Sequence, residues 1–420
     1  MKVTIVGLGY VGLPLACLCA EKGLDVYGVD TDKNKAELIN KGISPIDDPV
    51  LKESVKKVKG KIKVVSPEEA ISNSETVIVC VPTPVDEKHL PDLTALKGAC
   101  ETISKSLQKN SLVVIESTIF PGTVEEICFQ MLKRSNVKFY LAHCPERIDP
   151  GNKKFTIRNI PRAVAGTEKE STKKAAEFYR KIIEADIMEV SSVKAAEATK
   201  IMENTFRDVN IAFVNEMAKS FDKAGIDVTE VIKGASTKPF SFLPHYPGVG
   251  VGGHCIAVDP YYLISKAKQI GFNHDFLILA RKINESMPDY TVSLLENQLK
   301  KLNESLNGAK VGVLGLAYKG NVDDVRESPS FEVIHILKEK GAEVFVFDPH
   351  IQKGSNVKDF DELLKKSDYI ILATAHNEFK EMDLNKLKEN NIKIIIDGRN
   401  CLDKEKIKSL GILYHGVGRA

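Results

Sequence analysis

The segment with the most evident chemistry is a glycine-rich loop that ends in a cysteine. Residues 247–262 have the sequence PGVGVGGHCIAVDPYY, in which Cys255 stands at the threshold of a predicted helix. Glycines let backbone N–H groups approach a ligand, and a helix N-terminus favours the thiolate, the reactive form of cysteine. Asp259 lies one turn later on the same face, where it can hold a water or a cation. Because glycine and histidine flank Cys255, we predict a nucleophile rather than a buried structural thiol.

A second set of candidates lies on a long helix expected from Ser192 to about Ala224. Lys200 and Asn204 are spaced i and i+4, and Arg207 continues the same face. A lysine on an amphipathic helix normally points into solvent. Here apolar residues surround the three polar ones in AEATKIMENTFRDVNIAF, so we expect a buried polar row.

The start of the chain has the order strand, G-x-G-x-x-G, helix. Gly7 permits the tight turn, Gly9 lets the backbone approach a pyrophosphate, and Gly12 lets the helix pack on the strand. Asp30 follows the next strand, where a carboxylate accepts from both ribose hydroxyls of NAD and repels the 2′-phosphate of NADP. We predict NAD. FAD is the main alternative, but the second nucleotide signature expected of a flavoenzyme is absent.

Three further predicted strand ends carry polar residues. The segment VPTP contains Thr83, EST contains Thr118, and CPERIDPGN contains Glu146 and Arg147. Open α/β sheets bind ligands at the carboxyl ends of their strands, so all four are candidates. Taken alone, either threonine is equally compatible with an ordinary turn, and Glu–Arg neighbours are commonly surface ion pairs.

Short β-branched segments alternate with helical segments at both ends of the chain, a pattern typical of a parallel sheet with helices on both faces. The expected strands are Lys2–Val6, Asp25–Val29, Lys63–Val65, Val77–Val81, Leu112–Glu116, Lys138–Ala142, Lys310–Leu314, Glu343–Phe347, Tyr369–Ala373 and Lys393–Asp397. Helical patterns dominate the middle of the chain. We predict an α/β protein with two Rossmann-like doubly wound domains, 1–190 and 303–420, joined by a long central helix and a helical middle domain, 191–302.

Composition excludes several classes of protein. The 420 residues include 59 basic and 57 acidic side chains, for a net charge of +2, so no positive field is present to neutralise nucleic acid. Eight cysteines show no CxxC pair and no His/Cys spacing, so no metal site is predicted. We expect neither a signal peptide nor a membrane span. The prediction is a cytoplasmic protein whose cysteines, apart from Cys255, are reduced core residues.

The ordered motifs resemble those of the UDP-glucose/GDP-mannose dehydrogenase family. They are VGLGYVGLPLA, CVPTPVDE, ESTIFPGTVEE, CPERIDPGN, GVGVGGHCIAVDPYY, ARKINESMP and LGLAYKGNVDDVRESPS, followed by FDPH and IIDGRN. Members of this family oxidise a nucleotide sugar twice at C6, from alcohol to carboxylate, with two NAD⁺ used in succession at one site. The resemblance implies an NAD-dependent UDP-sugar 6-dehydrogenase, a homodimer formed through the long helix or a higher homo-oligomer, and a role in making polysaccharide or glycan precursors.

The resemblance also implies roles for individual residues. Cys255 resembles the nucleophile that attacks the C6 aldehyde, so that hydride loss gives a thioester which water cleaves. Lys200 and Asn204 resemble the pair that stabilises the developing oxyanion, with Lys200 or a bound water taking the first proton. The residues that resemble the groups orienting water for hydrolysis are Glu146, Thr118 and Asp259.

Ligand contacts follow from the same resemblance and from the motifs above. The predicted cofactor contacts are Gly7, Gly9, Tyr10, Val11, Gly12, Asp30, Lys35, Thr83, Thr118 and Arg326. The predicted substrate contacts are Glu146, Arg147, Ile148, Lys200, Asn204, Arg207, Tyr246, Gly250, Gly252, Tyr318 and Lys319.

The substrate sugar is a question of subgroup. With His before the cysteine and Val258 where glucose enzymes carry Lys, the cysteine motif resembles the UDP-N-acetylhexosamine branch. The segment STKPF at 236–240 resembles the N-acetylglucosamine enzymes, whereas mannosamine enzymes usually have a His-Pro-Arg segment there. Departures from the pattern are Ala257, where many relatives have Pro, and Asp48, where many have Glu. We predict oxidation of UDP-GlcNAc, with UDP-ManNAc and then UDP-glucose as alternatives.

Two other classes of protein stay open at this point. A two-electron dehydrogenase of the 6-phosphogluconate or hydroxyacyl type shares the first strand, the glycine loop and the long helix, but has no need of Cys255. A non-catalytic nucleotide-sugar binding protein keeps the glycines and is free to lose Lys200 and Cys255.

Overall fold

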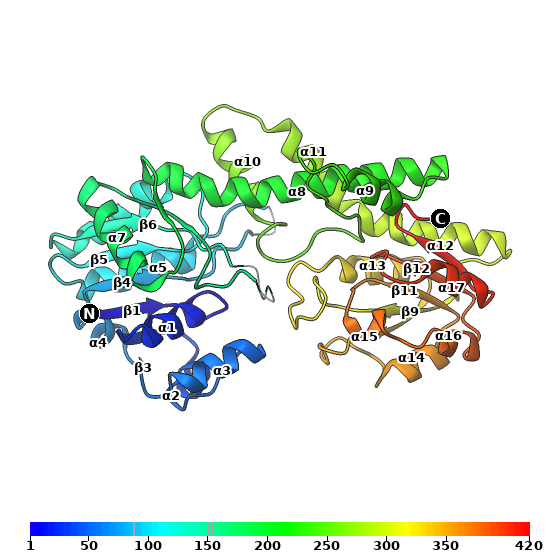
Figure 1. The fold of residues 1–420 in the computed structure, drawn as a ribbon, viewed down its shortest axis with the longest axis horizontal. Helices are drawn as coiled ribbons and strands as arrows, with labels where there is room; N and C mark the ends of the chain where they lie inside the picture. Colours follow the sequence, from blue (N-terminus) through cyan, green and yellow to red (C-terminus); the bar gives the residue numbers. More distant parts are fainter. Residues whose placement is uncertain (87–88, 149–151, 153) are drawn as a thin grey trace. The chain divides into compact units, whose positions relative to one another are not determined.

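The computed structural model describes residues 1–86, 89–148, 152 and 154–420 (Figure 1). The chain divides into two compact units, and each contains one sheet. The first unit comprises Met1–Glu203 and Tyr261–Asn273, and the second comprises Asn204–Pro260 and His274–Ala420. The predicted α/β fold with two Rossmann-like sheets and a helical middle is confirmed.

The sheet of the first unit has the strand order β3-β2-β1-β4-β5-β6-β7-β8. Its strands are β1 (Lys2–Val6), β2 (Asp25–Val29), β3 (Ile62–Val64), β4 (Thr76–Val79), β5 (Leu112–Ile115), β6 (Tyr140–His143), β7 (Arg162–Gly166) and β8 (Ile187–Glu189). The strand order reverses between β1 and β4, so the loops that follow these two strands diverge. Such a point is where doubly wound sheets bind dinucleotides.

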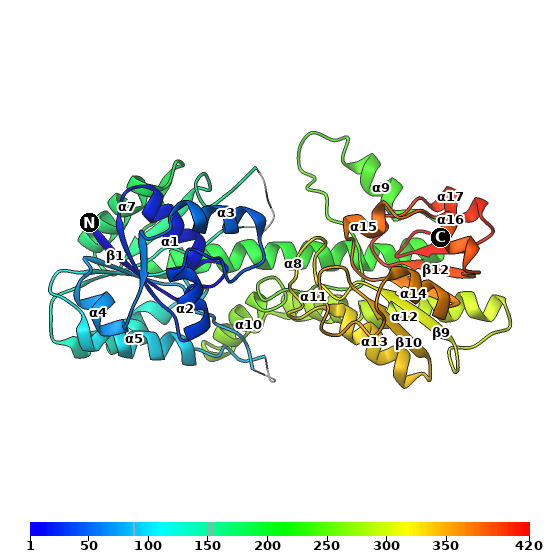
Figure 2. The same ribbon diagram turned by 90° about the horizontal axis from the view of Figure 1, so that it is seen from below.

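Helices cover both faces of this sheet, which explains why its central strands are mostly apolar. One face packs against α1 (Gly12–Glu21) and α7 (Lys169–Ile182), and the other packs against α4 (Pro67–Ser72) and α5 (Thr94–Ser106) (Figure 2). The remaining short helices are α2 (Lys33–Asn40), α3 (Pro49–Lys57), η1 (Val124–Cys128), α6 (Phe129–Leu132) and η2 (Lys133–Ser135). Asp48 caps α3 by accepting from the Leu51 N–H at 2.7 Å, a task that its short side chain suits.

The middle of the chain is helical. The long helix α8 (Val193–Ala224) has 32 residues and ends at Gly225, whose φ is +71°. Helix α9 spans Val228–Ala235. The other helices of this region are α10 (Asp259–Gln269), α11 (Asp275–Glu285) and α12 (Met287–Lys301). None of the helices in the described ranges is both long and apolar enough to cross a membrane.

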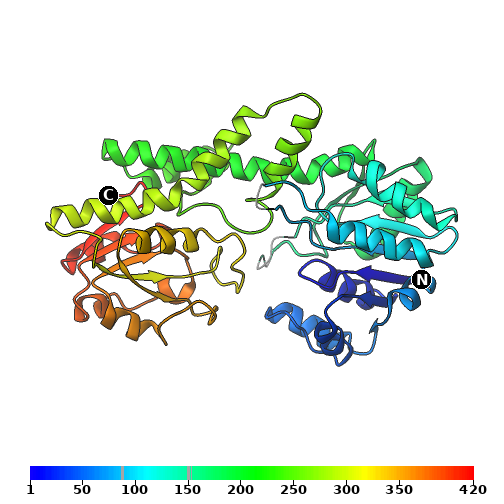
Figure 3. The same ribbon diagram turned by 180° about the vertical axis from the view of Figure 1, so that it is seen from behind.

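The second unit has a smaller sheet of five parallel strands in the order β10-β9-β11-β12-β13. They are β9 (Lys310–Leu314), β10 (Glu343–Phe347), β11 (Tyr369–Leu372), β12 (Ile394–Asp397) and β13 (Leu413–Gly416). Helices α12 and α13 (Pro329–Glu339) cover one face (Figure 3). The opposite face packs against α14 (Phe360–Lys366), α15 (Asn377–Lys380), α16 (Asn385–Glu389) and α17 (Lys404–Ser409).

The structure corrects the predicted elements in two ways. The sequence patterns did not predict β7, β8, β13 or α11. The three strands have only three to five residues and contain Arg, Glu, His or Gly, so they lack the continuous apolar signal of the central strands. In addition, β7 runs antiparallel to β6, with Ala142 opposite Gly166, so the first sheet is not wholly parallel.

Candidate active site

The three glycines of the first loop serve different purposes. Gly7 has a φ of +91°, and a Cβ there would lie 2.7 Å from the carbonyl oxygen of Cys80, at the end of β4. A Cβ on Gly12 would overlap the carbonyl oxygen of Gly7, so this glycine is needed for packing of α1. Gly9 faces open space, with no heavy atom within 4 Å of a Cβ placed there. The chain itself does not require a glycine at this position, but a pyrophosphate lying against the backbone does.

Asp30 lies directly beside this loop. Its Oδ2 accepts from the Leu8 N–H at 2.8 Å and its Oδ1 accepts from the Asp32 N–H at 2.9 Å. The carboxylate is half-buried, so an edge stays accessible to a ribose. Val11, the residue before α1, gives no side-chain cap, which leaves the helix N-terminus to an anion. The loop, the acid and the helix terminus together fit NAD.

The ends of β4 and β5 are tied together. The Thr83 hydroxyl donates to the carbonyl of Thr118 at 2.6 Å, and the Ser117 hydroxyl donates to the carbonyl of Val81 at 2.7 Å. The Tyr262 hydroxyl donates to the carbonyl of Thr83. The structure therefore brings the two predicted threonines to one edge of the sheet, next to the diverging loops.

Behind this edge lies a buried cluster that sequence reasoning missed. The Tyr179 hydroxyl donates to Glu116 Oε1 at 2.5 Å, and Arg162 Nη1 lies 3.6 Å from Glu116 Oε2. Burial raises the pKa of Glu116, and the Arg162 charge opposes that rise. Arg162 also donates to the carbonyl of Pro145 at 3.4 Å. The available signal was an arginine at the start of an otherwise small and apolar segment, RAVAG.

In the segment after β6, Glu146 is buried and Arg147 forms an ion pair with another residue. Glu146 is 7% exposed, and its carboxylate accepts from the Ile148 N–H. Arg147 does not pair with Glu146; its Nη2 lies 2.6 Å from Glu203 Oε1, and its Nη1 donates to the carbonyl of Pro161 at 2.9 Å. Residues 149–151 of the CPERIDPGN motif lie outside the described residues.

In the second unit, the glycine loop approaches other backbone closely. The Gly253 N–H donates to the carbonyl of Arg326 at 3.0 Å, and a Cβ on Gly253 would lie 2.8 Å from the Tyr318 ring. Gly252 is equally restricted, because a Cβ there would lie 2.6 Å from the carbonyl oxygen of Glu327. Gly250 has a φ of +132° and packs on Pro329.

Cys255 follows this loop and leads into α10. Its carbonyl accepts from the Asp259 N–H at 2.8 Å, so the chain turns helically from the cysteine onward. The thiol is half-buried. Asn204 Nδ2 donates to Asp259 Oδ2 at 2.5 Å, and both side chains are at most 5% exposed. The structure therefore brings two of the predicted catalytic side chains together, one turn from the cysteine.

The other cysteines differ from Cys255. None of the eight, all of which the structure describes, forms a disulfide. Five are buried, as predicted: Cys17, Cys19, Cys100, Cys128 and Cys144. Cys80 and Cys401 are only partly buried but pack against the cores. Burial raises the pKa of Cys401 to about 12, so it is an unreactive thiol at neutral pH.

The predicted polar row of α8 is partly right. Lys200 is 8% exposed and Asn204 is 5% exposed, so both are buried as expected. Arg207 is exposed, and its predicted place in the row is wrong. The row continues instead at Asp208 and Asn215, both fully buried. A charged side chain is seldom buried unless a group of opposite charge lies beside it. Asp208 has such a partner, because Arg281 Nη1 lies 2.7 Å from its carboxylate.

The predicted nucleotide contacts of the second unit lie in several settings. Tyr318 and Lys319 are half-buried in the loop after β9. Arg326 pairs with Asp324, its Nη2 lying 2.5 Å from Asp324 Oδ2. Tyr246 is exposed. Lys35, a predicted cofactor contact of the first unit, is half-buried on α2, where its N–H donates to Asp32.

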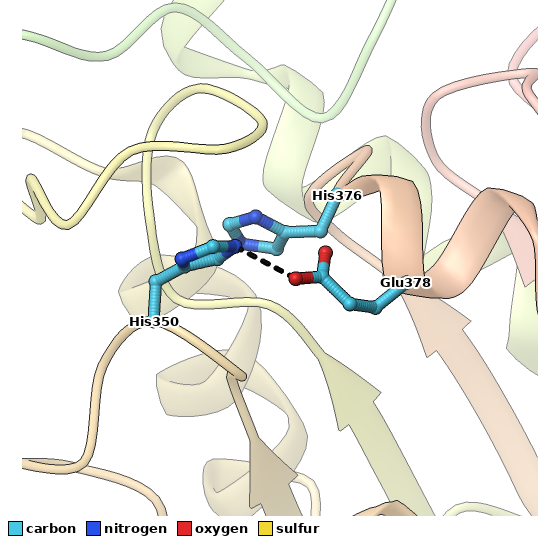
Figure 4. A group of neighbouring side chains, drawn as sticks. All are labelled: His350, His376 and Glu378. Carbon is cyan, nitrogen blue, oxygen red and sulfur yellow. Dashed lines mark ion pairs between the residues drawn. The ribbon is translucent and has the colours of Figure 1, made fainter. Parts of the chain in front are cut away.

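One group of side chains has the composition of a metal site, as Figure 4 shows. Ligand atoms of His350, His376 and Glu378 lie within 4.8 Å of one another. However, His376 Nδ1 accepts from the Asn321 N–H at 2.9 Å, and its Nε2 bonds to Asp348 Oδ2 at 3.0 Å. This pairing fixes the tautomer and occupies both ring nitrogens, so His376 has no lone pair available for a metal ion.

The two sheets and their loops define a class of protein, the NAD-dependent oxidoreductases with a second Rossmann-like unit. Three domain models of one family match the chain. They are the NAD binding domain at residues 1–183, the central domain at 194–286 and the UDP binding domain at 312–404. The chain belongs to the UDP-glucose/GDP-mannose dehydrogenase family, so it is an NAD-dependent UDP-sugar dehydrogenase.

Two curated relatives match almost the whole chain. The UDP-N-acetyl-D-mannosamine dehydrogenase of Pyrococcus horikoshii is 38% identical over 100% of this chain and 99% of its own. The UDP-N-acetyl-D-glucosamine 6-dehydrogenase of Pseudomonas aeruginosa is 37% identical over 97% of this chain and 98% of its own. Among solved structures, the UDP-D-ManNAc dehydrogenase of Pyrococcus horikoshii has a TM-score of 0.93 at 36% identity, covering 100% of this chain and 99% of that chain.

Proposed function

We propose that the protein oxidises C6 of a UDP-N-acetylhexosamine from the alcohol to the carboxylate in two steps, with Cys255 as the nucleophile of the second step. The relatives named above act on UDP-N-acetyl sugars, which supports this substrate class. The observation that carries the proposal is the placement of Cys255 on a glycine loop, one turn before the buried Asn204–Asp259 pair. Neither a two-electron dehydrogenase nor a binding protein needs that arrangement.

In the first step, the C6 hydroxyl loses a proton and its carbon loses a hydride. Bound NAD⁺ supplies the hydride acceptor. The Lys200 amine is buried, and it or a water bound to it takes the hydroxyl proton. Lys200 and the Asn204 amide stabilise the oxygen while it carries negative charge.

The second step needs a nucleophile, because the aldehyde carbon carries no hydroxyl whose oxygen can expel a second hydride from C6. The Cys255 thiolate adds to C6 and gives a thiohemiacetal. Loss of its hydride to a second NAD⁺, and of its hydroxyl proton, gives a thioester. Water then breaks the C–S bond, which releases the carboxylate and restores the thiol. We assign Asp259, Glu146 and Thr118 to the orientation of this water. The Asn204 amide holds Asp259 in place for that task.

For the sugar, we propose UDP-N-acetylglucosamine, which would yield the corresponding uronate for surface polysaccharide or glycan precursors. The support is the STKPF segment at 236–240. The relatives give no preference, because the glucosamine and mannosamine enzymes are 37% and 38% identical to this chain. Comparing kcat/KM for the two epimers decides this point, and a higher value for UDP-N-acetylmannosamine would refute the choice of sugar.

We also propose a homodimer formed through α8. The support is an exposed apolar row on this helix, where Met202, Phe206 and Phe213 are 66%, 48% and 58% exposed. Their spacing of four and seven residues puts them on one helix face. Light scattering is expected to give twice the 46.3 kDa chain mass, and a monomer would refute the proposal.

The test of the reaction counts NADH formed per UDP-N-acetylhexosamine consumed. We expect two with the unaltered protein, and no more than one with Cys255→Ala. The matched control is Cys401→Ala, which removes another partly buried thiol and is expected to retain two. One NADH per sugar from the unaltered protein would indicate a two-electron dehydrogenase. No NADH would indicate a binding protein. Two NADH from Cys255→Ala would refute the thioester mechanism.

A further inference from the structure

The buried polar row of α8 continues beyond the proposed catalytic residues as a chain of hydrogen bonds to the glycine loop. The Gly248 N–H donates to Asn215 Oδ1 at 3.0 Å, and Asn215 Nδ2 donates to Asn284 Oδ1 at 2.9 Å. Asn284 Nδ2 in turn donates to Asp208 Oδ1 at 2.8 Å, and Arg281 Nη1 donates to the same oxygen at 2.7 Å. We call Asn215 and Asn284, with these end groups, the asparagine relay.

Every member of the relay is taken out of water. Asn215 and Asp208 are fully buried, Asn284 is 1% exposed and Arg281 is 5% exposed. Burial raises the pKa of Asp208, and the Arg281 charge opposes this rise. A buried polar group that loses its partner is costly, so each bond of the relay constrains the next.

The relay also has a fixed direction. The Gly248 N–H can only donate, and the Asp208 carboxylate can only accept. Asn284 must therefore present Nδ2 to Asp208 and Oδ1 to Asn215. Asn215 must then present Nδ2 to Asn284, which leaves its Oδ1 for Gly248. Reversing either amide would place oxygen against oxygen or nitrogen against N–H, so one arrangement satisfies all four groups.

The loop held by the relay has little freedom of its own. A Cβ on Gly250 would lie 3.0 Å from Pro329 Cβ and 3.3 Å from the Asn284 carbonyl oxygen, so the loop passes directly over Asn284. At its far end the Gly253 N–H donates to the carbonyl of Arg326 at 3.0 Å. Cys255 follows two residues later.

We infer that Asn215 and Asn284 are positioning residues: by anchoring Gly248 they fix the course of loop 247–253 and, through it, the place of the Cys255 thiol. This inference rests on the proposed function, in which only the second oxidation uses the thiol. Loss of the relay therefore impairs the aldehyde step more than the alcohol step. A misplacement of about 1 Å costs up to roughly a hundredfold in rate.

The test uses two variants of the full-length protein with nearly unchanged side-chain volume. Asn215→Leu removes both hydrogen bonds. Asn215→Asp keeps an acceptor for Gly248 but places a carboxylate oxygen against Asn284 Oδ1. The matched control is Asn210→Leu, because Asn210 lies on the same helix and its side chain, among the described residues, donates to the carbonyl of Phe206 in its own turn.

Two measurements are made on each protein. Without substrate, hydrogen exchange of the Gly248–Cys255 amides and alkylation of Cys255 by iodoacetamide, followed on the peptide, report the loop and the thiol. With UDP-N-acetylhexosamine, NADH per sugar reports how far the aldehyde proceeds. We expect both Asn215 variants to exchange faster, to alter the alkylation rate severalfold and to lower NADH per sugar from two toward one, whereas Asn210→Leu matches the unaltered protein.

The outcomes separate the relay from simpler roles. Unchanged exchange and two NADH in both variants would overturn the inference. If Asn215→Asp keeps the exchange rates, the alkylation rate and the two NADH per sugar of the unaltered protein, the inference is also overturned. The hydrogen bond to Gly248 would then suffice without the bond to Asn284. If Asn215→Leu does not fold, Asn215→Asp decides alone. If the unaltered protein forms no NADH from any UDP-sugar, the proposed function fails, while exchange and alkylation still decide the relay.

Discussion

The loops that follow β1 and β9 share one backbone plan. Each begins with a glycine of positive φ, +91° at Gly7 and +101° at Gly315, and continues as LGYVG or LAYKG. In each sheet an aspartate directly after the neighbouring strand accepts backbone N–H groups from the loop. The pairs are Asp30 with Leu8, and Asp348 with Leu316 and Ala317.

The two loops differ in what surrounds the aspartate. Asp30 is half-buried, and Gly9 beside it faces open space. Asp348 is 3% exposed and bonds to His376 at 3.0 Å, and the position matching Gly9 holds the buried Ala317. The Asp348 carboxylate is therefore buried and hydrogen-bonded within the protein, whereas the Asp30 carboxylate can still accept a hydrogen bond from a ribose.

The comparison teaches that a strand–glycine–helix start does not by itself specify a dinucleotide site. The distinguishing features are an accessible acid and an open second glycine position. The first loop has both and lies in the NAD binding domain of the family, and the second has neither and lies in the UDP binding domain.

The largest expected effect tests the packing of the first loop. In Gly12→Ala the new methyl group overlaps the Gly7 carbonyl, so α1 must move away from β1. We expect the free energy of unfolding to fall by roughly 3 kcal/mol or more. Denaturant unfolding measures this, and a change below about 1 kcal/mol would contradict the packing role.

A smaller effect concerns the closed acid of the second loop. The His376 hydrogen bond and the N–H groups of Leu316 and Ala317 outweigh burial and lower the pKa of Asp348 to about 2. Because this value lies below the unfolded value of 3.8, the stabilisation is present above pH 4 and is lost as the pH falls toward 2. The expected loss is about 2 kcal/mol.

Unfolding measured between pH 2 and pH 5 tests this linkage. The stability difference between the unaltered protein and Asp348→Asn should shrink as the pH falls through this range. A difference that stays constant would show that Asp348 is not held as the anion.

Gly9→Ala tests the openness of the first loop. Nothing in the chain lies within 4 Å of the added methyl group, so stability should change by less than about 0.5 kcal/mol. The methyl group occupies the space of the pyrophosphate, so NAD⁺ affinity should fall roughly tenfold or more. Titration calorimetry measures the affinities for NAD⁺ and for UDP, and the UDP affinity serves as the control. An unchanged NAD⁺ affinity would refute the role of Gly9.

The smallest effect comes from making the second loop resemble the first. Ala317→Gly removes one buried methyl group and adds backbone freedom, so we expect a loss of about 1 kcal/mol. No NAD⁺ site should appear, because Asp348 stays bonded to His376. Binding of a second NAD⁺ per chain would show that a glycine at position 317, rather than an accessible Asp348, determines whether the loop binds NAD⁺.

Local signals explain what the sequence predicted. The G-x-G-x-x-G loop and Asp30 depend on residues close together in the chain, and Gly225 sets the end of α8. Glycines and helical periodicity report such features directly.

The missed features join distant parts of the chain. Tyr179 meets Glu116 across 63 residues, and Asn284 meets Asn215 across 69. No spacing rule links such residues, because only the fold brings them together. Arg207 shows the converse: helix periodicity placed it on the buried face, but the cost of burying an unpaired guanidinium keeps it exposed.

The most direct test of the comparison titrates NAD⁺ and UDP separately into the unaltered protein and into Gly9→Val. The account predicts one NAD⁺ per chain, lost in Gly9→Val, and UDP binding that is the same in both proteins. Two NAD⁺ per chain, or loss of UDP binding in Gly9→Val, would contradict the assignment of one ligand to each loop.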